Sequence, residues 1–162
     1  MLVPALALAV LAAMTAPAGA GDQRTSLGGG VSVVLPRGWH VVRHASEVTD
    51  PIPRAFATFH VRLARHSCEC GSPDIAGFPR DGAFVLAWEY SRITRRDLRY
   101  FPVHAEDFRI GRSVISDNCA ASDGRTFRAG GRGFDVRIYL GPDAPASARH
   151  QIAAILDSWR VT

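Results

Sequence analysis

The chain contains no lysine, since arginine supplies all 19 of its basic residues, against 15 acidic residues. Chemistry that needs a lysine amine is therefore excluded, namely Schiff-base formation, the ammonium of a phosphate-binding loop and side-chain acylation. Alanine, glycine, proline and arginine are all abundant and all have GC-rich codons, so this bias indicates a GC-rich genome before it indicates a function. The net charge of +4 allows weak attraction to anionic surfaces but does not predict nucleic-acid binding.

Catalytic motifs are missing as well. The sequence has no G-x-S-x-G elbow, H-E-x-x-H pair, phosphate loop or dinucleotide fingerprint. Gly28, Gly29 and Gly30 precede an apolar strand pattern, whereas a phosphate cradle links a strand to a helix. We interpret the 6 histidines as surface or partly buried side chains. The sequence therefore predicts no cofactor, and it favours a protein that is not an enzyme.

Residues 1–20 have the pattern of a secretory signal, with an apolar run and small residues, Ala18 and Ala20, before a cleavage at Gly21. The run is shorter than a membrane span of about 20 residues. We therefore expect a secreted or cell-envelope protein that keeps no stable membrane span after cleavage. Residues 21–30 are polar and glycine-rich, which predicts a flexible leader. Residues 31–162 then form a single domain.

Most of that domain has strand patterns, at residues 31–35, 39–43, 56–65, 83–90, 108–115, 125–129 and 134–140. Alternation within residues 56–65 predicts a strand with one solvent-exposed face, after a proline-containing loop at residues 49–53. Residues 83–90 are apolar on both faces and predict the central strand. Glycines at 130, 131 and 133 predict a hairpin turn between the last two strands. In the second arm the inward residues are Phe134, Val136, Ile138 and Leu140, and the outward ones are Asp135, Arg137 and Tyr139.

The last segment predicts a helix. Asp143 or Ser147 is placed to cap it, and Pro145 suits its first turn. Apolar residues then recur at helical spacing: Ile152, Ile155, Leu156 and Trp159. Strands followed by one long helix predict an α+β fold, in which an antiparallel sheet of about six or seven strands packs against the C-terminal helix.

Two stretches resemble the PsbP-like family. Residues 31–39 (VSVVLPRGW) look like that family's opening hairpin, and residues 152–161 (IAAILDSWRV) look like its closing helix. The family includes extrinsic proteins of photosystems and many exported bacterial proteins of unknown function. The resemblance implies a central antiparallel sheet with helices on its faces, and it carries over no functional residue.

The three cysteines predict a structural disulfide in an exported protein. Cys119 is expected to pair with Cys68 or Cys70, and the sequence leaves both partners open. The bridge would close a loop of about fifty residues, which the chain-entropy estimate values at roughly 4 kcal/mol. One thiol would remain free.

The same residues support an alternative interpretation. His66, Cys68 and Cys70 alternate along the chain, so that on an extended segment all three side chains point to one side. With Cys119 they would offer three thiolates and an imidazole, a set suited to zinc or, through the thiolates, to copper(I). A thiol-redox function of the Cys68–Cys70 pair is the third possibility.

Four arginines gather in residues 91–101, where one or two helical turns are expected before Pro102: Arg92, Arg95, Arg96 and Arg99. Such a cluster predicts a site for an anionic envelope component or an acidic protein partner, with Tyr100 and Phe101 available for stacking. The alternative is a solvated surface balanced by nearby carboxylates, at Glu89, Asp97 or Glu106.

Taken together, these patterns predict an exported, small α+β domain that acts as a non-catalytic binding or accessory module at the cell envelope. The alternative is a metal-binding or thiol-redox protein that uses His66, Cys68, Cys70 and Cys119.

Overall fold

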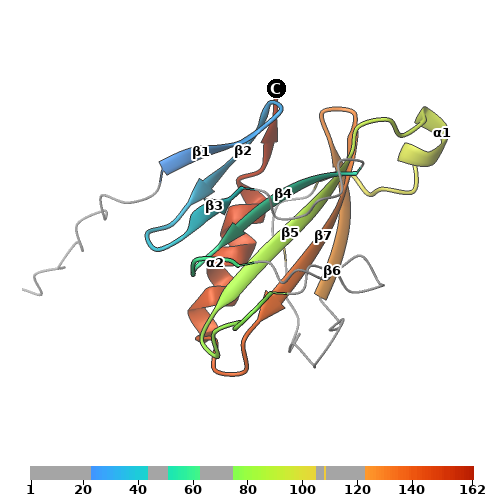
Figure 1. Ribbon diagram of the computed structural model, residues 1–162. Helices are drawn as coiled ribbons and strands as arrows, with labels where there is room; N and C mark the ends of the chain where they lie inside the picture. Colours follow the sequence, from blue (N-terminus) through green and yellow to red (C-terminus); the bar gives the residue numbers. More distant parts are fainter. Residues whose placement is uncertain (1–22, 44–50, 63–74, 105–107, 109–122) are drawn as a thin grey trace, which may run out of the picture.

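The computed structural model describes residues 23–43, 51–62, 75–104, 108 and 123–162, and their strands form two antiparallel sheets (Figure 1). The larger sheet has the order β3-β4-β5-β7-β6. Its strands are β3 (His40–Val42), β4 (Ile52–Ala57), β5 (Ala83–Tyr90), β7 (Arg132–Leu140) and β6 (Asp123–Ala129). The smaller sheet contains β1 (Gln23–Gly28), β2 (Val31–Leu35) and β8 (Arg160–Val161), in that order. The helices are α1 (Arg95–Leu98) and α2 (Ala146–Asp157).

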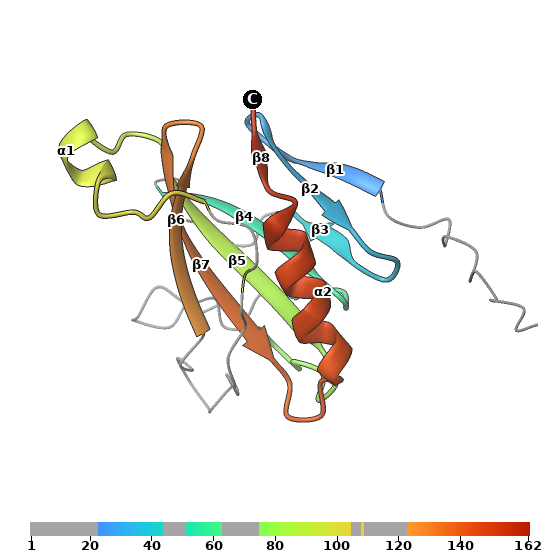
Figure 2. The ribbon, with the colours of Figure 1, turned by 180° about the vertical axis from the view of Figure 1, so that it is seen from behind.

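The predicted α+β fold is confirmed, with its strands divided between two sheets instead of forming one. Figure 2 shows α2 lying across one face of the larger sheet. The main core lies between them and includes side chains of the smaller sheet, such as Val31 and Val33. Among the described residues, neither helix has the length and hydrophobicity of a membrane-spanning segment.

The prediction that β5 is the central strand is confirmed, because β4 and β7 pair with its two edges. Its side chains supply both faces of the sheet. Val85 and Ala87 belong to the main core. Phe84, Leu86 and Trp88 belong to a second hydrophobic cluster on the opposite face. Burial on both faces explains why this segment is apolar without alternation.

The predicted hairpin between β6 and β7 is also confirmed. Gly130 and Gly131 form its turn with φ values of 56° and 75°, a conformation that a two-residue hairpin turn requires and that glycine adopts without strain. The predicted inward residues of β7 are all buried in the main core. Tyr139 was expected to face solvent, and that expectation is wrong: the side chain is buried in the second cluster.

The flexible leader predicted for residues 21–30 is wrong for residues 23–30. Gln23–Gly28 forms β1, which pairs with β2 at the edge of the smaller sheet. Only Leu27 of this strand is buried. An edge strand with most of its side chains in solvent has no hydrophobic alternation, so its sequence resembles a polar leader.

The strand predicted at residues 56–65 lies earlier in the chain, where β4 spans Ile52–Ala57. Pro53 is tolerated because β3 pairs only with Ala55–Ala57, which leaves that side of Pro53 without a β3 neighbour. The alternation itself reflects burial. Phe59 and Val61 pack against the second cluster, although residues 58–62 are not in a strand.

The predicted terminal helix is confirmed as α2, but its predicted cap is not. Pro145 occupies the N-cap position without a side-chain hydrogen bond. Asp143 instead forms an ion pair with Arg80, and Ser147 is exposed. The four apolar residues at helical spacing are buried in the main core, as predicted: Ile152, Ile155, Leu156 and Trp159. Of the strand predicted at residues 108–115, only Phe108 lies within the described residues.

Candidate functional site

The predicted arginine cluster lies at α1, a single turn that projects from the sheet beyond β5 (Figure 1). Thr94 begins this turn, because its hydroxyl accepts a hydrogen bond from the Asp97 amide at 3.1 Å. All four arginines of the cluster are exposed. Arg92 already takes part in an interaction, so we do not count it among the cations available to a ligand. The remaining three, Arg95, Arg96 and Arg99, form what we call the arginine face.

Within the described part of the chain, no carboxylate forms an ion pair with Arg95, Arg96 or Arg99. Asp97 accepts a hydrogen bond from the Thr94 hydroxyl at 2.7 Å. Glu89, which the sequence offered as a counter-charge, binds arginines elsewhere. Glu106 lies outside the described residues. The three guanidinium groups are therefore accessible to an anion from solution.

Among the described residues, Tyr100 alone stacks on the arginine face. The Arg99 guanidinium lies 5.0 Å from the Tyr100 ring centroid and donates a hydrogen bond to the Tyr100 hydroxyl at 3.0 Å. Phe101 was expected beside the arginines and instead packs inward. Its ring lies 5.8 Å from that of Tyr90 and covers Gly133, where a Cβ atom would contact the ring at 3.1 Å.

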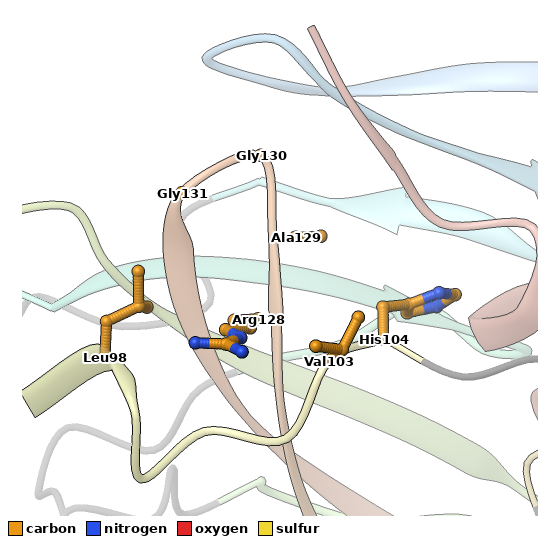
Figure 3. A pocket seen from close by; sticks show the side chains of 7 residues that line it. All are labelled: Leu98, Val103, His104, Arg128, Ala129, Gly130 and Gly131. Carbon is orange, nitrogen blue, oxygen red and sulfur yellow. The ribbon is translucent and has the colours of Figure 1, made fainter. Parts of the chain in front are cut away.

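A cavity of about 410 Å³ opens next to α1, at the turn between β6 and β7. Figure 3 shows its lining: Leu98 from α1, Val103 and His104 from the segment that follows, and residues 128–131 of the hairpin. We call this cavity the turn pocket. It lies where Val103 forms a parallel bridge with Arg128 of β6. The Arg128 amide donates to the Pro102 carbonyl at 2.7 Å, and the His104 amide donates to the Arg128 carbonyl at 2.9 Å.

The turn pocket combines apolar and cationic groups. Val103, one of its lining residues, is 64% exposed, and the other exposed large hydrophobic side chain of the described chain, Tyr100 at 68%, lies outside the lining. Arg128 is a half-buried residue, and its guanidinium has no hydrogen bond or ion pair with another residue in the described segments. His104 is fixed in place, because its Nε2 lies 2.8 Å from the Leu156 carbonyl and its ring packs edge-on against Phe127.

A second cavity, of about 370 Å³, lies near the start of α2. Two of its polar side chains, Thr58 and Gln151, already have partners, and the third, Asp81, is an exposed carboxylate. The Thr58 hydroxyl accepts from the Ala83 amide at 2.9 Å, and the Gln151 carbonyl oxygen accepts from the Trp39 indole at 2.8 Å. The two bonds and the negative charge of Asp81 make this cavity less suited to an anionic ligand than the turn pocket.

The sequence did not reveal the buried charge cluster of Arg54, Glu89 and Arg132. Glu89 is 1% exposed at the end of β5. Its Oε2 lies 2.7 Å from Arg54 Nη2, and its Oε1 lies 2.9 Å from Arg132 Nη1. A carboxylate within an otherwise apolar, fully buried strand must find cationic or hydrogen-bonding partners, and that was the available signal.

The buried charge cluster also holds the turn between β1 and β2. Arg54 Nη1 donates to the Leu27 carbonyl at 3.0 Å, and Arg132 Nη1 donates to the Gly29 carbonyl at 2.6 Å. Gly29 has a φ of 57°, and a Cβ atom there would overlap Arg54 Nη2. The cluster thus links the two sheets, and we interpret it as structural.

Other charge interactions keep their groups in fixed protonation states near neutral pH. Burial, reinforced by the Asp135 carboxylate, raises the pKa of the Tyr90 phenol above its usual value. A hydrogen bond to Asp135 raises the pKa of Arg137. At the surface, hydrogen bonds from Arg80 hold the pKa of the Asp143 carboxyl below its usual value. Tyr90 therefore stays neutral, and Asp143 and Arg137 stay charged.

The predicted disulfide and the alternative metal set, which involve His66, Cys68, Cys70 and Cys119, lie outside the described residues. Within the described segments, no group of three or more histidine, cysteine, aspartate or glutamate residues is arranged to hold a metal ion. That finding concerns other residues and leaves both interpretations as predictions.

The resemblance of residues 31–39 and 152–161 to PsbP-like proteins likewise stays a prediction from the sequence. Those residues contribute β2, the turn after it, the C-terminal half of α2 and β8. No protein-family model, curated protein or solved structure matches the chain.

Proposed function

We propose that this protein is an exported, non-catalytic binding module of the cell envelope, which holds an anionic partner through its arginine face. The observation that carries the proposal is the combination of three exposed arginines with no carboxylate partner in the described chain. A balanced, solvated surface would pair such charges with nearby acids. Arginine suits the task, because its planar fork binds carboxylate and phosphate groups through two hydrogen bonds.

The first prediction concerns the arginine face itself. Replacing Arg95, Arg96 and Arg99 together by alanine should weaken binding to an acidic polysaccharide by about tenfold or more, since each cation near an anionic surface contributes about 1 kcal/mol. Binding should also weaken as salt rises, because exposed charges are screened. Binding of the full chain to a polyuronate, measured by calorimetry at several salt concentrations, checks this expectation. Vesicles containing phosphatidylglycerol replace the polyuronate in a second arm, which distinguishes a lipid from a carbohydrate source of the anion.

The matched control removes the same charge from another part of the surface. Arg37, Arg43 and Arg62 are exposed and lie outside α1 and the turn pocket. Their joint replacement by alanine lowers the net charge equally and should leave most of the affinity intact. Equal losses in the two triple variants would show that binding follows net charge alone, and the proposed site would then be wrong.

Export and the disulfide form a separate part of the proposal. We expect the extracytoplasmic fraction to contain a chain that begins near Gly21. Reduction should raise its intact mass by about 2 Da, the two hydrogens gained when one disulfide opens. Among the single replacements of Cys68, Cys70 and Cys119 by serine, Cys119→Ser should abolish the shift, since Cys119 is the expected common partner. Bound zinc or copper with no mass shift would instead support the metal alternative.

A further inference from the structure

The turn pocket and the arginine face are adjacent, and Leu98 connects them. Leu98 belongs to α1, the same turn that carries Arg95 and Arg96, and its side chain lines the pocket (Figure 3). The next residues along the chain, Arg99 and Tyr100, are exposed. A partner that binds the arginines is therefore brought next to an apolar opening.

The chemistry of the pocket differs from that of the arginine face. Val103 is 64% exposed, and the pocket's other apolar side chains, Leu98 and Ala129, are partly buried. Together they form an apolar wall. A polyanion made only of sugars or phosphates offers nothing apolar to that wall. A polypeptide can place an apolar side chain there while its carboxylates meet the guanidinium groups. Tyrosine and arginine are also among the residues that most often dominate protein–protein binding energy.

Charge complementarity selects an acidic segment among polypeptides. Arg128 adds a fourth cation without a carboxylate partner in the described chain, and this residue is half-buried at the pocket itself. Water screens the attraction between a carboxylate and a half-buried arginine less than it screens an exposed pair. A cavity of about 410 Å³ accommodates a side chain of leucine size.

We infer that the partner of this surface is an acidic polypeptide segment that inserts an apolar side chain of leucine size into the turn pocket and places flanking carboxylates on Arg128 and the arginine face. This inference rests on the proposed function and specifies its partner. The competing partner is a polyanion without apolar groups, which the experiment tests directly.

The experiment compares two short peptides, each with glutamates on both sides of a central residue that is leucine in one and serine in the other. The full chain should bind the leucine peptide about tenfold more tightly, the effect expected for partial burial of one leucine side chain. Val103→Ser should bring the ratio of the two affinities close to one, whereas Val103→Leu should preserve it. Because Val103 is largely exposed, neither change should unfold the protein, which circular dichroism and a urea titration verify.

Variants of the cations separate this inference from the proposed function. Arg128→Gln and the triple alanine variant of the arginine face should both weaken the two peptides, since each removes charge that either peptide uses. Equal binding of both peptides to the unmodified chain, with polyuronate binding still dependent on the arginine face, would overturn the inference and leave the proposed function intact. If neither the peptides nor the polyuronate depends on the arginine face, both fail.

Discussion

Replacing Glu89 by glutamine should lower the free energy of unfolding by about 3 kcal/mol. The change keeps the shape of the side chain and removes its charge, so that the guanidinium groups of Arg54 and Arg132 lose their shared counter-ion. Breaking a buried ion pair from one side costs about 3–5 kcal/mol. We expect the lower end of this range, because Arg132 keeps 27% of its side chain in solvent.

Urea denaturation followed by circular dichroism measures this loss. The control is Asp143→Asn, which changes the same chemical group in the exposed ion pair with Arg80, where the two side chains are 75% and 56% exposed. Exposed pairs contribute little to stability, so that this variant should unfold almost as the parent does. If Glu89→Gln lost no more stability than Asp143→Asn, the buried charge cluster would not contribute to the stability of the fold.

Arg54→Lys tests whether the shape of arginine matters in the same cluster. Arg54 Nε and Nη2 bind Glu89 while Nη1 donates to the Leu27 carbonyl. The single ammonium of lysine cannot reproduce that fork, so the lysine variant should also be destabilised. Codon usage explains the general absence of lysine, but at position 54 arginine also has a specific structural role.

Replacing Trp159 by alanine should cost about 3–5 kcal/mol, the usual range for removing a large aromatic side chain from a core. Trp159 is 4% exposed, and its ring centroid lies 5.5 Å from that of Phe127 and 5.1 Å from that of Phe134. The side chain joins the end of α2 to the β6–β7 hairpin. Its loss would remove a large share of the roughly 5–15 kcal/mol that stabilises a typical domain.

Trp159→Phe distinguishes packing from hydrogen bonding. The indole Nε1 of Trp159 is buried and has no hydrogen-bond partner in the described chain. Phenylalanine keeps an aromatic ring beside Phe127 and Phe134 and gives up no hydrogen bond. The Phe variant should therefore be clearly more stable than the Ala variant in urea titrations followed by circular dichroism. Equal losses would mean that ring packing at this position contributes little.

Sequence patterns predicted the elements in which the burial of each face, or the φ values of the turn, determines the residue types. The fully buried strand β5 is continuously apolar, and the β6–β7 hairpin carries glycines at the two turn positions that need positive φ values. The edge strand β1 was not predicted, because only its Leu27 is buried and its sequence therefore does not alternate between apolar and polar residues. The start of α2 was predicted too specifically, because Asp143 is drawn away by Arg80, a partner 63 residues distant.

In the candidate site, too, some features could be predicted from the sequence and others could not. The arginines of α1 are neighbours in sequence, so their clustering could be predicted, together with the stacking of Tyr100. The turn pocket depends on Val103 pairing with Arg128, a long-range bridge that no local pattern encodes. The same holds for the buried charge cluster, where Glu89 lies 35 residues from Arg54 and 43 residues from Arg132.

The pairing of β2 with β8 affects how the chain can fold. The Thr162 amide donates to the Gly30 carbonyl at 2.9 Å, across 132 residues of sequence. Contacts this distant in sequence form late and slow folding, because a long loop must close before they contribute stability. The smaller sheet therefore cannot be completed before residues 160–162 have been synthesised. Until then β2 pairs only with β1, and its other edge has no partner in the smaller sheet.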